Sequence, residues 1–321
     1  MGYRRLTLGQ RYQIAILKSK GAINSEIARE LGVHRSSITR ELRLCKTKYC
    51  AESAQRISLK NLKKRSEANR KIKGSLKRQI DQLILSDWSP EQAEQTIFEE
   101  TYKQISLRTI YRYIERDALE GGKLKKHLRI LRKQRKDRKK PKYRSDQGLV
   151  RNRVPIEQRP KIVEKRIRVG DYERDTMLGS RGGNVLLAIV DRKTRYLKIA
   201  MLPKLNAENA HQATVKLLKN KVIKTITNDN GIEFAFHQRT SKKLNVPIYF
   251  SRSYRAWERG TNENTIGLLR QYFPKKQPIP TLTKKQLEAI QDKLNKRPRK
   301  CLGFKTPYEL YTGKHPGRVL R

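Results

Sequence analysis

The chain has 321 residues, of which 76 are Lys or Arg and 30 are Asp or Glu, so its formal net charge is +46. A positive charge of this size calls for a polyanionic partner, most often nucleic acid, and argues against an ordinary metabolic enzyme. No run of residues approaches the roughly 18 apolar residues of a membrane span, and the first residues lack the apolar region of a signal peptide. We therefore expect no membrane partner.

The cysteine and histidine patterns argue against a structural zinc site. Cys45, Cys50 and Cys301 fit neither a disulfide framework nor a paired zinc site, and the five histidines form no His-x-x-x-His pair. We expect a reducing, cytoplasmic compartment, and we expect that any bound metal has oxygen ligands.

Two clusters of basic residues divide the chain. Residues 56–78 hold ten Lys or Arg against one acid, and residues 121–145 hold thirteen against one. Such blocks repel themselves and behave as linkers or arms until a polyanion binds. The predicted segments are a helix-turn-helix domain at 1–55, a basic linker at 56–79, a second helix-turn-helix-like domain at 80–120, a basic linker at 121–160 and an α/β domain at 161–321.

The run INSEIARELGVHRSSITREL has the spacing of a helix-turn-helix. Ile27 and Leu31 lie on one side of a first helix, Gly32 supplies the tight turn, and Ile38 and Leu42 point inward from a second helix. Short polar and guanidinium groups on the outward face of the second helix suit base edges and phosphates in the major groove. The side chains that we expect to contact DNA are Arg35, Ser36, Ser37, Thr39, Arg40 and Arg43. A three-helix bundle with a solvated basic face is the alternative.

A second helical pair is predicted in the middle of the chain. Ser89 and Gln92 have the spacing of a capping box, and Ser106 precedes a second helix. We expect a further helix-turn-helix in which Arg108 and Arg112 point outward to DNA. A small helical spacer is the alternative.

The last 160 or so residues change character. Short apolar runs such as NVLLAIVD, RYLKIAML and VPIYFS alternate with helical stretches near 207–220 and 261–273. This order predicts a mixed α/β domain with a five-stranded sheet, and the length is sufficient to bury one core.

Three acids in this domain stand out by their context. Asp175 lies in a predicted strand, Asp229 follows an apolar strand, and Glu263 begins a helix. All three can converge at the carboxyl edge of a mixed sheet, where oxygen ligands select Mg²⁺ or Mn²⁺ and two such ions support phosphoryl displacement. Spacing alone leaves open that the strand acid forms a salt bridge and that Asp229 is a turn residue.

The strings around these acids carry a family resemblance. WERGTNENTIGLLRQYFPK, with TNDNGIEF upstream and LNKRPRKCLGFKTPYEL downstream, resembles transposases of the IS-thirty family of bacterial insertion sequences, as do the helix-turn-helix run and WSPEQ…TIYRYI. The resemblance implies a ribonuclease-H-like domain with an Asp-Asp-Glu triad at Asp175, Asp229 and Glu263. The 33 residues between the last two match the family's spacing.

The same resemblance implies an activity and its partners. We expect a DNA transposase that binds the terminal inverted repeats of its element and catalyses strand cleavage and 3′-hydroxyl strand transfer. It implies two Mg²⁺ or Mn²⁺ ions per active site, double-stranded DNA as partner, a homodimer or higher oligomer on DNA, and a location in the cytoplasm at the bacterial nucleoid.

The first acidic motif departs from the family pattern. The family usually has Trp-Glu-Gly-Asp, whereas this chain has Tyr172-Glu173-Arg174-Asp175. The bulk of Arg174 makes Asp175 the least secure of the three ligands. Glu173 shares a strand face with Asp175, so it is either a neighbour of that ligand or a substitute for it.

Further DNA contacts are expected around the last acid, with ordinary capping and surface polarity as the alternative. The residues are Asn262, Asn264, Arg270, Arg297, Arg299 and Lys300. Gly267 shares the helix face of Glu263 and should leave room for the DNA backbone. Trp257 either stacks on an unpaired base or packs, while Cys301 and Phe304 are expected in the core.

Two other functions remain open at this point. A catalytically inactive helix-turn-helix DNA-binding regulator derived from such a transposase would need only the helical modules and the basic arms. A retroviral-type integrase shares the chemistry but normally brings a zinc-binding His/Cys module, for which the sequence offers no ligands.

Overall fold

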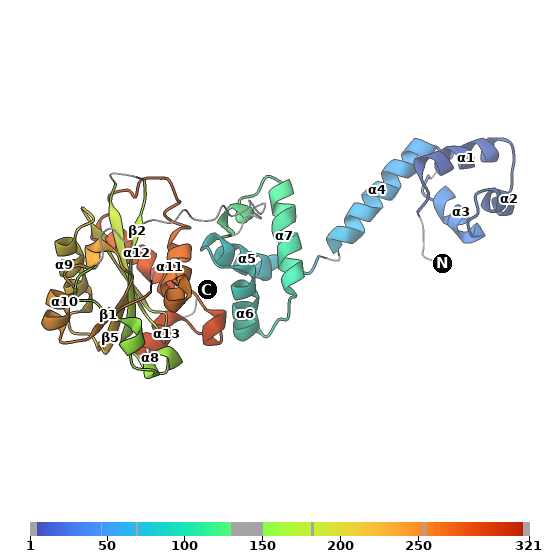
Figure 1. The fold of residues 1–321 in the computed structure, drawn as a ribbon. Coiled ribbons are helices and arrows are strands. Elements are labelled where there is room, and N and C mark those ends of the chain that lie inside the picture. The colour runs from blue at the N-terminus through green and yellow to red at the C-terminus, as the bar shows by residue number, and fades with distance from the viewer. Residues whose placement is uncertain are drawn as a thin grey trace. The chain divides into compact units, whose positions relative to one another are not determined.

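The chain divides into two units in the computed structural model, residues 1–73 and residues 74–321 (Figure 1). The structure describes residues 5–45, 47–68, 70–129, 150–180, 183–252 and 255–316. Among these residues, no helix combines the length and the apolar character that crossing a membrane requires.

The first unit is a helix-turn-helix followed by a long helix. Its core consists of the fully buried Ile14, Ile27 and Ile38 together with Ala28. Gly32 adopts φ +61° in the turn, a conformation that favours glycine, so the expected turn is confirmed. The helices are α1 (Leu8–Ser19), α2 (Asn24–Glu30), α3 (Arg35–Leu42) and α4 (Ala51–Ala68).

Helix α4 occupies most of the segment that we expected to be a basic linker at 56–79. Its first turn buries Ala51 and Ala54, and the helix packs against α1. Arg11 of α1 strengthens this contact, because its Nη1 lies 2.5 Å from Oε1 of Gln55. Small apolar residues on one face thus keep the helix folded despite its basic charge, and residues 74–79 belong to the next helix.

The second unit begins with a helical module. Its core contains Ile80, Leu83, Ile97 and Ile110, none of which is exposed. The capping box at the start of α6 is present as predicted. The module's elements are α5 (Gly74–Leu85), α6 (Pro90–Thr101), α7 (Leu107–Leu119) and the short 3₁₀ helix η1 (Leu124–His127). Residues 130–149 of the expected linker 121–160 lie outside the described residues.

A mixed sheet forms the centre of the remaining domain. The strand order is β1-β6-β5-β2-β3-β4. The pairs β1–β6, β6–β5 and β5–β2 are parallel, and the pairs β2–β3 and β3–β4 are antiparallel. The strands are β1 (Val154–Pro155), β2 (Asp171–Leu178), β3 (Val185–Asp191), β4 (Leu197–Leu202), β5 (Thr225–Asn228) and β6 (Ile248–Phe250). This topology confirms the ribonuclease-H-like expectation.

Among the residues that the structure describes, the sheet has six strands rather than the expected five. The additional strand β1 has two residues and pairs Val154 with Tyr249 of β6. So short a strand at a sheet edge carries no alternation that the sequence could reveal, and it lies inside the segment that we expected to be a linker.

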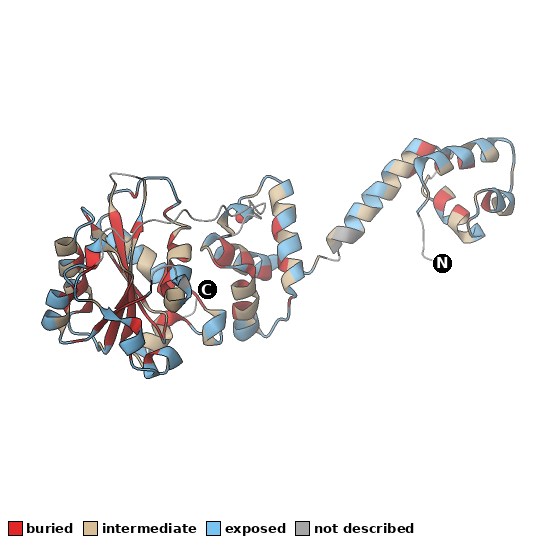
Figure 2. Ribbon diagram, viewed as in Figure 1, coloured by how far each residue is buried: buried red, intermediate tan, exposed pale blue. Residues whose placement is uncertain are grey.

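Helices cover both faces of the sheet (Figure 1). Helices α9 (Ala207–Leu218) and α10 (His237–Leu244) cover one face, where Leu187 packs against Ala210 and its neighbours. Helices α11 (Gly260–Leu269) and α12 (Lys284–Asn295) cover the other, where Ala188 packs among Leu269 and Leu294. Every residue of β3 is consequently buried, as the red strands of Figure 2 show.

Short elements complete the domain. Thr306 and Glu309 form the predicted capping box at the start of the last helix. The remaining elements are η2 (Ile156–Gln158), α8 (Ile162–Lys165), η3 (Ile232–Phe234), η4 (Ala256–Arg259), η5 (Lys300–Leu302) and α13 (Pro307–Thr312).

Candidate active site

Asp175 and Asp229 follow aligned positions of two adjacent parallel strands. Glu173 of β2 pairs with Thr227 of β5, and each aspartate lies two residues further along its own chain. Because the register of parallel strands continues residue by residue, the two carboxylates come to the same edge of the sheet. This register explains why acids 54 positions apart in sequence become neighbours.

The guanidinium of Arg259 lies between the two carboxylates. Its Nη1 donates to Oδ2 of Asp175 at 2.8 Å, and its Nη2 lies 3.6 Å from Oδ2 of Asp229. Its Nε donates to Oγ of Ser251 at 3.1 Å. We did not foresee this residue from the sequence, where its one signal is a cation placed one helical turn before Glu263.

The carboxylate pair suits a hard divalent cation. Burial raises the pKa of Asp175 to about 6, and Asp229 adds to this rise, whereas Arg259 opposes it. Two partly buried carboxylates that repel each other are stabilised by a shared cation, which here is the guanidinium. Oxygen donors of this kind are those that Mg²⁺ and Mn²⁺ prefer, so the residues fit such an ion in part.

Glu263 does not join the two aspartates. It is exposed on α11, whereas its neighbour Asn262 is buried and donates its backbone N–H to Oε2 of Glu173 at 2.8 Å. Successive helix residues are rotated by about 100°, so Glu263 points to the side of the helix when Asn262 faces the sheet. Within the described ranges, no three His, Cys, Asp or Glu side chains form a group that could hold a metal ion. The structure brings Asp175 and Asp229 together without Glu263, so the three-acid site stays a prediction.

Glu173 is a structural neighbour of Asp175 rather than its substitute. It is completely buried and forms an ion pair with Arg192. It also accepts the backbone N–H of Asn262 at 2.8 Å, which ties β2 to α11. With these partners the carboxylate is not available to a metal ion or to DNA.

Arg174 lies on the opposite face of β2 from Asp175. Successive strand residues face opposite sides of a sheet, so its side chain enters the layer of α9 and α10. There its Nε donates to Oδ1 of Asn228 at 3.0 Å, and its guanidinium lies 4.3 Å from the ring centre of Phe234. Burial lowers the pKa of Arg174 to about 9, and the nearby Asp229 opposes this. The departure from the family motif therefore leaves Asp175 undisturbed.

Two residues expected to contact DNA are buried instead. Asn262 has no exposed surface, and Arg297 is 2% exposed. The guanidinium of Arg297 donates to the hydroxyl of Tyr272 at 2.9 Å and to Oε1 of Gln271 at 3.3 Å. We correct both expectations, because both Nη atoms of Arg297 have partners within the fold and the contact of α11 with the sheet buries Asn262.

The other expected contacts in this domain remain accessible to different degrees. Asn264 and Lys300 are exposed, and Lys300 forms an ion pair of 2.6 Å with Glu91. Arg270 and Arg299 are half-buried, and each donates to a backbone carbonyl, of Leu178 and Leu294 respectively.

The burial of three further residues can be compared with what the sequence predicted for them. Trp257 is 70% exposed, which favours stacking over packing. Cys301 is exposed and Phe304 is half-buried, which corrects the expectation that both belong to the core. Cys301 lies in η5, and Phe304 lies in the tight turn that follows it, with φ +62°.

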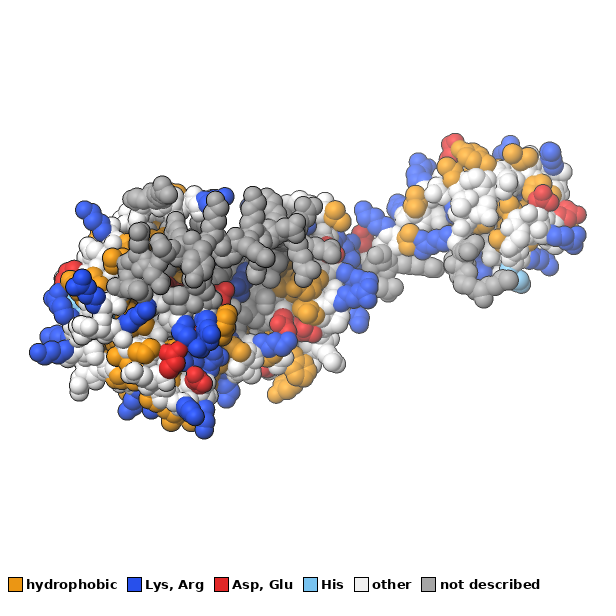
Figure 3. Space-filling model, in the orientation of Figure 1, with side chains coloured by type: hydrophobic (Ala, Val, Ile, Leu, Met, Phe, Trp, Pro, Cys, Tyr) orange, Lys and Arg blue, Asp and Glu red, His pale blue; other side chains and the backbone are white. Residues whose placement is uncertain are grey.

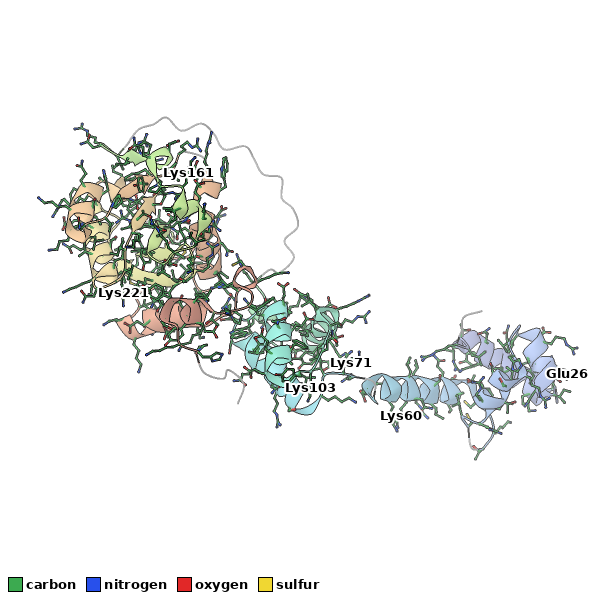
Figure 4. The ribbon with its side chains drawn as sticks, turned by 90° about the horizontal axis from the view of Figure 1, so that it is seen from below. Glu26, Lys60, Lys71, Lys103, Lys161 and Lys221 are labelled. Atoms are coloured by element: carbon green, nitrogen blue, oxygen red, sulfur yellow. The ribbon has the colours of Figure 1, made fainter. Side chains whose placement is uncertain are left out.

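The helical modules present their basic residues to solvent. Arg35 and Arg40 are exposed on α3, Arg43 is exposed directly after it, and Arg108 and Arg112 are exposed on α7. Between the arginines of α3, the three short polar residues Ser36, Ser37 and Thr39 are partly exposed. Lys and Arg side chains are spread over the visible face of both units (Figure 3), and the labelled lysines of Figure 4 come from separate parts of the chain.

Comparisons with known proteins place these features in a family. Residues 2–43 match a family model described as a helix-turn-helix domain. The chain is 38% identical to the transposase for insertion sequence element IS4351 of Bacteroides fragilis, across 96% of this chain and 95% of that one. It is 33% identical to transposase InsI for insertion sequence element IS30A of Escherichia coli (strain K12), across 95% and 82% respectively.

Among solved structures, the catalytic core domain of BIV integrase matches 44% of this chain and 93% of that chain, with a TM-score of 0.36 and 18% identity.

Proposed function

The chain belongs to the IS-thirty (IS30) family of insertion-sequence transposases, and we propose that it cuts and joins DNA at the ends of its element with Asp175, Asp229 and Glu263. In this proposal the protein binds the terminal inverted repeats, cleaves a strand there and transfers the resulting 3′-hydroxyl to a phosphodiester of target DNA. It acts on DNA of the bacterial nucleoid, in the cytoplasm.

One observation gives the catalytic assignment its main support. Asp175 and Asp229 face a common cation at aligned positions of adjacent parallel strands, at a sheet edge where ligands of open α/β folds bind. A partly buried pair of like-charged carboxylates is costly without a cation, so its presence indicates a site that binds one. Arg259 meets this need in the metal-free protein.

Asp175 and Asp229 would hold a divalent cation, and Glu263 would complete the ligand set for two ions. When bound, Mg²⁺ or Mn²⁺ would neutralise charge on the scissile phosphate and activate the attacking oxygen. The protein's own contribution is to hold the carboxylates in place, through the β2–β5 register and through Gly231, whose backbone N–H donates to Oδ1 of Asp229 at 3.2 Å.

The helical modules would supply DNA recognition. The exposed arginines of α3 would read the inverted repeat, and Arg108 and Arg112 of α7 would contact a further stretch of duplex. Bringing two element ends together requires at least a dimer on DNA.

Single substitutions of the three acids test this proposal. We expect Asp175→Asn, Asp229→Asn and Glu263→Gln each to abolish Mg²⁺-dependent cleavage of a duplex that carries the element's own end. Binding of that duplex, measured by fluorescence anisotropy, should stay within about twofold of the parent, because none of the changes removes a cation. Asp292→Asn, on the exposed side of α12, is the matched control and should cleave normally.

Cleavage at the parental rate by all three variants would overturn the catalytic assignment. The chain would then act on DNA only by binding it, as the regulator considered above would.

A further inference from the structure

Two neighbouring pockets flank the N-terminal half of α11. One has a volume of about 500 Å³ and the other about 310 Å³, and Gly260 and Asn264 line both of them. Since the pockets share these residues, they lie next to each other along the helix. Cations line the two sides: Arg129, Arg270 and Lys275 on one, and Arg166, Arg195 and Arg299 on the other.

These cations have few acidic partners. Glu263 is the one acid among the residues that line the two pockets. The Nε atoms of Arg270 and Arg299 are buried and lack a hydrogen-bond partner in the described part of the chain. Burial lowers the pKa of Arg299 to about 10, and the nearby Arg129 adds to this effect. Like charges with unsatisfied donors are costly unless an anion joins them.

Arg129 reaches the larger pocket from the helical module. It follows η1, where the backbone carbonyl of His127 accepts a hydrogen bond of 3.1 Å from Nε2 of Gln271. His127 is fixed in turn by Asp87, whose Oδ1 lies 2.8 Å from its Nδ1. The start of the segment that carries Arg129 is therefore anchored to the end of α11.

Gly267 makes room for this arginine. A Cβ atom at Gly267 would lie 2.7 Å from an Nη atom of Arg129. We had expected the space above this glycine to be left for the DNA backbone. In the structure a cation occupies that space, one helical turn after Glu263.

We propose that the two pockets form one phosphate track across α11, in which the backbone of the bound DNA lies over Asn264 and Arg129 is a phosphate contact supplied by the helical module. The inference rests on the proposed function, since it places DNA beside Glu263. Guanidinium groups bind phosphate oxygens through paired N–H donors, so a backbone in this track supplies the missing acceptors.

The test compares one variant on each side of the track with a matched control. Arg129→Gln and Arg166→Gln each remove one cation from a pocket. Lys221→Gln removes one cation from an exposed position after α9, a helix that covers the other face of the sheet (Figure 4). All three are made in the full chain carrying Asp175→Asn, and the probe is a duplex with the element's terminal inverted repeat.

Affinity is measured by fluorescence anisotropy at several salt concentrations. We expect each track variant to bind about tenfold more weakly and to reduce the slope of log K against log salt by ~0.9, the value for one lost phosphate contact. Lys221→Gln should change both the affinity and the salt slope by only a small fraction of these amounts. Unchanged thermal unfolding would show that the variants are folded.

A second measurement locates the contact. A series of duplexes, each with one neutral methylphosphonate near the cleavage site, should include a position that weakens the parent about tenfold and leaves Arg129→Gln unaffected. If Arg129→Gln and Arg166→Gln behave like Lys221→Gln, the track is not a DNA site. That result would not contradict the proposed function. The proposed function fails if the acid-to-amide variants cleave DNA at the normal rate.

Discussion

Arg259 donates a 2.8 Å hydrogen bond from Nη1 to Oδ2 of Asp175, although the two residues are 84 positions apart in the chain. The side chains are 15% and 19% exposed, so the pair is largely shielded from water. This interaction sets the charge state of the first acidic residue in the metal-free protein, because it opposes the effects of burial and of Asp229.

Removal of this guanidinium should raise the pKa of Asp175 above about 6. The pKa of Asp175 in the folded protein lies above the value of ~3.9 in the unfolded chain. Protonated Asp175 therefore stabilises the fold below pH ~4, and this stabilisation is lost as the pH rises through about 6. Arg259→Gln should move this loss to higher pH. Carboxyl-carbon NMR titration of the metal-free protein measures the pKa directly. Arg252→Gln, which removes a cation that pairs with Glu258, should leave it unchanged. An unchanged or lower pKa in Arg259→Gln would contradict the prediction.

The buried ion pair of the first unit should matter for folding. Arg11 and Glu41 meet at 2.6 Å, with 4% and 7% of their side chains exposed. Arg11→Met would leave the carboxylate buried without its cation, so we expect a loss of about 3–5 kcal/mol in the free energy of unfolding. Urea denaturation measures this change in the free energy of unfolding. Arg239→Met breaks an ion pair with Glu208 that is 58% and 41% exposed, and should cost less than ~1 kcal/mol. Equal effects of the two substitutions would show that burial does not control this pair.

A glycine at the end of β2 should not tolerate a side chain. A Cβ atom on Gly179 would lie 2.6 Å from the backbone oxygen of Gln277 and 2.9 Å from the backbone nitrogen of Ile279. Since backbone atoms cannot easily move aside, Gly179→Ala should destabilise the protein by about 1–3 kcal/mol. Gly260→Ala, where no atom lies within 4 Å, should change thermal stability by less than ~0.5 kcal/mol. A neutral Gly179→Ala would mean that the segment around residue 278 shifts freely.

The start of α3 should carry sequence recognition. Arg35 is exposed at the first position of this helix, where side chains of helix-turn-helix proteins reach base edges. Arg35→Gln should lower the affinity for the inverted repeat by about 1–3 kcal/mol and lower that for random duplex much less. Competition binding measures the ratio, with Arg29→Gln on α2 as control. An equal loss on both duplexes would instead make Arg35 a phosphate contact.

Local chemistry predicts the elements well in this chain. The capping boxes at Ser89 and Thr306 are present, because each depends on residues only three positions apart. The helix-turn-helix and the mixed sheet follow from hydrophobic spacing and from alternation. The short strand β1 was not predictable, since two residues have no pattern.

Side-chain orientation at the candidate site was less predictable. Polar residues lie on both sides of α11, so the sequence did not show that Asn262 would face the sheet, where its backbone N–H donates to Glu173. Arg259 and Arg297 look like surface cations in the sequence, and only the fold gives them partners far along the chain. The pairing of Asp175 with Asp229, in contrast, needed only the correct strand order.

The contacts of the helical module with η5 determine where a recombinant catalytic fragment should start. Nε2 of Gln92 donates to the backbone carbonyl of Pro298 at 2.6 Å, and Glu91 pairs with Lys300. A fragment trimmed to the sheet domain at residue 150 would expose this docking surface to water and would lack Arg129. Expression for crystallography or for single-turnover kinetics should therefore begin at Gly74, the first residue of the second unit.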